Sequence, residues 1–77
     1  MTKRDYAEFR AEADRLVATA AAQVAGIRAL IDDYKRNGLH TRAAQEILEE
    51  LEGNLELLQR QRDIIAGLVE MGARQDR

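Results

Sequence analysis

A chain of 77 residues is long enough for one small domain, and the absence of cysteine excludes disulfide bonds as a source of stability. The net charge of −2 argues against a generic nucleic-acid-binding protein, because such proteins usually carry a strong basic excess. The absence of proline, with abundant alanine, leucine, glutamate and arginine, favours helix along nearly the whole chain.

The sequence predicts neither secretion nor a membrane span. Its N-terminal residues lack the apolar stretch of a signal peptide, and the longest uncharged run, residues 16–27, is too short to cross a bilayer. We therefore expect a cytoplasmic protein that makes no contact with a membrane.

The first predicted helix covers about residues 3–36. Apolar and aromatic side chains follow a helical repeat at these positions: Tyr6, Phe9, Ala13, Leu16, Val17, Ala20, Val24, Ile27, Leu30, Ile31 and Tyr34. This spacing is typical of a helix that packs along a coiled-coil-like seam. Four further alanines between residues 18 and 25 lie off the seam, which reflects either helix propensity alone or a second contact surface.

Residues 37–41 predict a turn between two helices. Gly38 can adopt the left-handed conformation that ends a helix, and Leu39 can then fold back onto the last turn. Thr41 is a favourable first residue for the second helix, since its hydroxyl can accept a hydrogen bond from a free backbone N–H. Ala44 occupies the position where a full capping box would have Glu or Gln.

The second predicted helix covers about residues 42–73. Its seam consists of Ala44, Leu48, Leu51, Leu55, Leu58, Ile65 and Val69. Folding the chain about Gly38 places large side chains of one helix opposite small ones of the other, as close packing requires. Arg62 interrupts this seam, and we expect its side chain to reach a carboxylate at the seam edge, near Glu12. The predicted fold is all-α, a single domain over residues 1–77 formed by a long antiparallel two-helix hairpin.

A second apolar stripe lies on the C-terminal half of the second helix, rotated by roughly 100° from the seam. It consists of Leu57, Ile64, Leu68 and Met71. A solitary hairpin would leave this stripe in water, so we expect it to contact a second copy or another protein. The simplest closed assembly is a homodimer that forms a four-helix bundle.

Five acids without an intervening base occupy the loop-proximal half of the second helix. They are Glu46, Glu49, Glu50, Glu52 and Glu56. Such a run is ordinarily a solvated helix face, but it is also suited to docking on the basic surface of a partner.

No catalytic or cofactor-binding pattern is evident in the sequence. Cysteine and serine are absent, and His40, the single histidine, lies in the predicted turn. A carboxylate-bridged metal site would need a Glu-x-x-His pattern, which does not occur. The glycines do not have the spacing of a phosphate-binding loop. We therefore expect a protein that is not an enzyme and that uses no cofactor or metal.

The central part of the chain, residues 24–65, resembles a group of short bacterial hypothetical proteins. The matching features are residues 27–31, Tyr34, residues 38–41, Ala44, residues 47–48, residues 51–52, Leu55, Leu57 and residues 62–63. These helical-hairpin proteins consist of a helix, a Gly-x-x-Thr turn and a helix rich in Leu and Glu, and they have no established activity. The resemblance implies a small accessory protein of phage or mobile-element origin and transfers no catalytic residues.

The function that the sequence favours is a non-enzymatic protein–protein interaction module, an adaptor or inhibitor, which binds through the acidic run or the apolar stripe. A phage-encoded inhibitor of the anti-CRISPR type is one form that this function could take. The alternative is a Rop-like dimeric bundle that binds structured RNA with salt-sensitive affinity through Arg10, Arg60 and Arg74. Nucleic acid is the less favoured partner, because basic residues are scattered among acids and the three aromatic residues fall on the seam.

Overall fold

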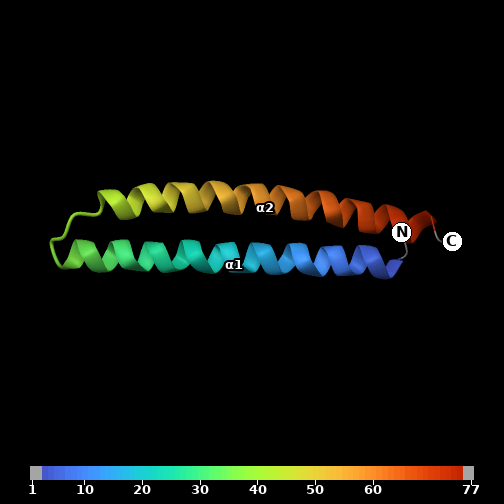
Figure 1. The fold of residues 1–77 in the computed structure, drawn as a ribbon, viewed down its shortest axis with the longest axis horizontal. Coiled ribbons are helices and arrows are strands. Elements are labelled where there is room, and N and C mark those ends of the chain that lie inside the picture. The colour runs from blue at the N-terminus through green and yellow to red at the C-terminus, as the bar shows by residue number, and fades with distance from the viewer. Residues whose placement is uncertain (1–2, 76–77) are drawn as a thin grey trace.

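The computed structural model describes residues 3–75, with side chains described for residues 4–72. Helix α1 spans Lys3–Arg36 and helix α2 spans Arg42–Gln75. The two helices lie side by side and antiparallel, joined by one short turn (Figure 1). The molecule is therefore a thin rod, with Cα extents of 61 × 14 × 13 Å. The predicted all-α helical hairpin is confirmed.

The turn ends α1 with the backbone pattern known as a Schellman motif. Gly38 has a φ of 67°, in the left-handed region, as predicted. The Leu39 N–H donates to the Tyr34 carbonyl at 2.9 Å, and the Gly38 N–H donates to the Lys35 carbonyl at 3.2 Å. These bonds satisfy carbonyl groups that have no partner within the helix. The side chain of Leu39 itself remains exposed.

Helix α2 starts at the predicted residue but without the predicted side-chain cap. The Thr41 carbonyl accepts the first helical hydrogen bond, from the Gln45 N–H at 2.8 Å. The Thr41 hydroxyl makes no hydrogen bond to any other described residue, so it does not cap the free N–H groups of this helix end. The helix continues to Gln75, slightly beyond the predicted end near residue 73.

The core is a narrow seam between the helices. Its buried side chains are small or β-branched and come mostly from α1: Ala13, Val17, Ala20, Val24, Ile31 and Ala44. The seam side chains of α2 are larger and only half-buried: Leu48, Leu51, Leu55, Leu58, Ile65 and Val69. Near the open end, the Tyr6 ring lies against the backbone of α2, since a Cβ added to Gly72 would be 3.1 Å from two of its ring carbons.

Three residues predicted for the seam lie at its edge instead. Phe9, Leu16 and Leu30 are 52%, 45% and 39% exposed. The predicted apolar stripe of α1 is wider than one neighbouring helix can cover, so α2 buries the middle of the stripe and leaves this border in water. The prediction that these three side chains belong to the hairpin core was wrong.

Arg62 reaches a carboxylate, as predicted, but not one near Glu12. Its Nη2 and Nε atoms lie 3.2 and 3.3 Å from the Asp63 carboxylate, and its side chain is 34% exposed. Glu12 instead pairs with Arg15 on the same helix. The Arg62 stem thus covers part of the seam while its charged end stays at the surface.

Neither α1 nor α2, over the residues that the structure describes, contains a segment apolar enough to cross a bilayer.

Candidate functional site

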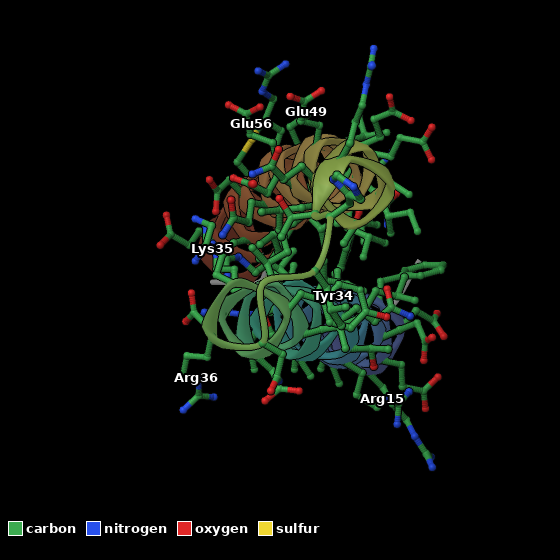
Figure 2. All side chains as sticks on the ribbon, turned by 90° about the vertical axis from the view of Figure 1, so that its left-hand side faces the viewer. Arg15, Tyr34, Lys35, Arg36, Glu49 and Glu56 are labelled. Carbon is green, nitrogen blue, oxygen red and sulfur yellow. The ribbon has the colours of Figure 1, made fainter. Side chains whose placement is uncertain are left out.

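The acidic cluster, defined as Glu46, Glu49, Glu50, Glu52 and Glu56, lies on the loop-proximal half of α2 and is exposed throughout. Figure 2 shows Glu49 and Glu56 pointing away from α1, at the outer surface of the hairpin. Glu52 differs from the others because it lies beside α1, where Arg28 Nη2 approaches its carboxylate at 3.4 Å. The structure therefore brings four of the five acids onto the outer part of α2.

Ion pairs neutralise this cluster only in part. Glu46 pairs with Arg42 at 3.7 Å and Glu56 pairs with Arg60 at 3.8 Å, both one helical turn apart. Pairs this exposed contribute little stability, so a basic partner can compete for these glutamates. Glu49 and Glu50 form no ion pair with any described residue. The cluster thus presents a negative surface that intramolecular contacts leave available.

The C-terminal apolar stripe, defined as Leu57, Ile64, Leu68 and Met71, also lies at the surface. Its side chains are 47–65% exposed, with Ile64 the most exposed of the four. Leu57, Ile64 and Met71 recur every seven residues and so share one line along α2. The outer surface of α2 consequently carries the acidic cluster towards the turn and, towards the open end of the hairpin, the C-terminal apolar stripe beside exposed Asp63 and Glu70.

A third surface, which sequence reasoning missed, runs along one flank of the hairpin. We define this uncharged face as Phe9, Leu16, Gln23 and Leu30 of α1 with Ile47, Asn54, Gln61 and Leu68 of α2. All eight side chains are exposed, and none carries a charge. Leu68 lies where the uncharged face meets the C-terminal apolar stripe. The signal in the sequence is the seven-residue spacing of uncharged residues on both helices, next to the seam positions.

A small hollow shows that the two halves of the uncharged face lie on the same side of the molecule. It has a volume of about 120 Å³. Its walls are formed by Phe9, Glu12, Ala13 and Leu16 of α1 and by Leu58, Gln61 and Ile65 of α2. Ligand pockets usually have volumes of about 300–1,000 Å³, so this hollow suits part of a packed side chain better than a metabolite.

The opposite flank has a different character. There Arg28 of α1 and Glu52 of α2 form an ion pair between the helices, with side chains that are 62% and 45% exposed. Half-exposed ion pairs of this kind contribute modestly to stability, but they favour the alignment of α1 along α2 in which the two charged side chains meet. The hairpin therefore has one charged flank and one uncharged flank.

The described residues contain no group of three or more His, Cys, Asp or Glu side chains placed to hold a metal ion. His40 is exposed in the turn. Of the arginines proposed for RNA binding, Arg10 and Arg60 are exposed on different helices, and Arg60 pairs with Glu56. The side chain of Arg74 lies outside the described residues.

Comparisons with protein-family models, with curated proteins and with solved structures found no significant match to this chain.

Proposed function

We propose that this protein is a non-enzymatic cytoplasmic interaction module that binds a partner protein through the outer surface of α2. The observation that supports this proposal most is that the acidic cluster and the C-terminal apolar stripe follow each other along this surface and are both exposed. The partner is expected to present basic side chains beside an apolar patch.

The cluster and the stripe would contribute differently to such a complex. Glu46, Glu49, Glu50 and Glu56 would attract a basic surface from a distance and orient it, because complementary charge mainly raises the association rate and selects the partner. Leu57, Ile64 and Met71 would then supply apolar contact area, which contributes most to affinity once water is excluded. An adaptor and an inhibitor both fit this arrangement, since each needs only to occupy a surface of its partner.

Charge reversal on α2 tests the proposal. Glu49→Lys combined with Glu56→Lys changes two outward-pointing acids and disturbs only the exposed Glu56–Arg60 pair. The immobilised protein is incubated with an extract of the cells that encode it. We expect the variant to capture at least about tenfold less of the partner protein than the unmodified chain does. Leu57→Ala combined with Ile64→Ala should also weaken capture.

The matched control is Asp14→Lys combined with Asp32→Lys, which makes the same change in net charge at exposed positions of α1. This control should capture the partner as the unmodified chain does. Equal loss in both charge variants would point to net charge alone and contradict the proposed surface. Unchanged capture by both α2 variants, with helicity retained, would also contradict it.

A further inference from the structure

We infer that the uncharged face is the contact surface of a symmetric homodimer, so that a second copy of this chain covers it and completes a four-helix bundle. This inference goes beyond the partner-binding function and uses a different surface. It also differs from the sequence-based expectation, in which the C-terminal apolar stripe held the dimer together.

The width of the apolar stripe on each helix supports a bundle of more than two helices. A helix that packs against a single neighbour needs two apolar positions in every seven, whereas a bundle helix uses three. On α1, the third position is the line through Phe9, Leu16 and Leu30, which α2 leaves exposed. On α2, it is the line through Ile47 and Leu68, which α1 leaves exposed. Both third positions lie on the same flank, where one further layer would cover them together.

The incomplete core indicates the same need for a second layer. No described large side chain of the hairpin is fully buried, and the seam leucines of α2 are only half-buried. The buried residues facing them are mostly alanine and valine, which bring the helices close but enclose little volume. A second copy on the uncharged face would bury the exposed sides of residues such as Leu58 and Ile65, which line the hollow.

The accessible area of the chain is consistent with this assembly. The chain exposes 6026 Å². A globular monomer of 8.7 kDa would expose only about 4,700 Å². The excess of about 1,300 Å² is larger than the roughly 800 Å² per partner that a standard protein–protein interface buries.

The residue pattern of the uncharged face favours a second copy over a different protein, because the face is complementary to itself. In an antiparallel hairpin its residues form four layers: Leu30 with Ile47, Gln23 with Asn54, Leu16 with Gln61, and Phe9 with Leu68. The two end layers are wholly apolar and the two middle layers contain the amides. A twofold axis in the plane of the face, along or across the rod, therefore places the apolar end layers on each other and the amide-containing middle layers on each other, with Leu16 opposite one of the amides.

The middle amides would also fix the register of the bundle. An amide carries both donors and an acceptor, so Asn54 can pair across the interface with Gln23 if the axis runs along the rod, or with Gln61 if the axis runs across it. A shift along the rod would bring them against leucine or phenylalanine and leave them unpaired, which is costly. The eight residues of the face carry no charge, and Glu12, which borders the hollow beside them, is exposed and pairs with Arg15. The outer surface of α2 would remain open on both copies.

Sedimentation velocity of the full chain, over a wide range of concentration, tests the inference. The unmodified chain should sediment as a species of twice 8.7 kDa. Leu16→Glu combined with Leu30→Glu should raise the dimer dissociation constant by at least about a hundredfold, because each carboxylate would lose its water on association. The matched control, Leu57→Glu combined with Ile64→Glu, introduces as many charges on α2 outside the face and should remain dimeric.

A nearly isosteric variant separates dissociation from misfolding. Gln23→Glu combined with Asn54→Asp alters exposed side chains without changing their shape, so the hairpin should keep its far-UV circular dichroism and yet become monomeric. Three results would overturn the inference: a monomeric unmodified chain, a dimer that tolerates charges on the uncharged face, or a dimer that dissociates only in the Leu57 and Ile64 variant. Capture of the partner protein by a monomeric variant would leave the proposed function standing while the dimer inference was tested separately.

Discussion

Gly38 is the residue on which the turn most depends, and its replacement by alanine gives a quantitative prediction. Its φ of 67° costs an L-residue about 1–2 kcal/mol, while the lower entropy of the unfolded chain returns about 0.4–1 kcal/mol. A Cβ at this position would meet no atom within 4 Å, so the backbone conformation alone sets the penalty. We expect Gly38→Ala to lower the free energy of unfolding by about 1 kcal/mol.

Gly53→Ala is the matched control for this prediction, because it changes the same atoms in the middle of α2. A Cβ at Gly53 also meets no atom within 4 Å, and alanine is favoured over glycine in a helix by about 0.5–1 kcal/mol. The two variants should therefore differ by about 1.5–2 kcal/mol in free energy of unfolding, or roughly 6–16 °C in melting temperature for a domain of this size.

Thermal and urea unfolding, followed by circular dichroism, measures this difference. Both variants must be compared at one protein concentration, since association of the folded state would make the melting temperature depend on concentration. If Gly38→Ala were as stable as Gly53→Ala, the left-handed turn would not be the structural constraint described above.

Two further predictions concern the seam and the charged flank. Ala20→Leu should lower the free energy of unfolding by about 1–3 kcal/mol, because Ala20 is buried between the helices. Ala21→Leu, at an exposed position, should change it by less than about 0.5 kcal/mol. Equal free energies of unfolding for the two variants would contradict the burial of Ala20 in the seam. A double-mutant cycle on Arg28 and Glu52 should give a coupling free energy of about 0.2–1 kcal/mol that falls with added salt. A larger coupling free energy that does not change with salt would contradict an exposed ion pair at this position.

Local chemistry in the sequence was sufficient to predict the hairpin. The glycine after a long helical repeat predicts where α1 ends, and the backbone adopts the conformation expected for Gly38. The helical repeats of both halves predict two long helices that pack along one seam, and the structure confirms them. Thr41 was a weaker guide, since its hydroxyl makes no capping bond within the described chain although the helix begins there.

The division of the apolar stripe could not be predicted from the repeat alone. Phe9 and Ala13 differ by about one helical turn, and both fit the repeat of a seam. Which of them is buried depends on the rotation of α1 against α2, which only the packed structure gives. Small residues such as Ala13 and Ala20 bring the helices together, and the bulkier Phe9 and Leu16 are left at the border.

The candidate surfaces differ in how far the sequence indicated them. The acidic cluster and the C-terminal apolar stripe were predicted and are exposed, but their roles in binding stay predictions. The uncharged face was missed because its central positions are Gln23, Asn54 and Gln61, which a search for apolar residues passes over. Of its other positions, the helical repeats assign Phe9, Leu16 and Leu30 to the seam and Leu68 to the C-terminal apolar stripe, so the uncharged flank does not stand out as one surface.

Thiol labelling at two neighbouring positions tests most directly the claim that one flank is covered and the outer surface of α2 is open. The chain has no cysteine, so Gly53→Cys and Asn54→Cys each introduce a single thiol, the first on the outer surface and the second on the uncharged face. We expect labelling at position 54 to slow markedly as protein concentration rises, while labelling at position 53 keeps the same rate. Equal, concentration-independent rates at both positions, or protection at position 53 alone, would contradict the proposed arrangement.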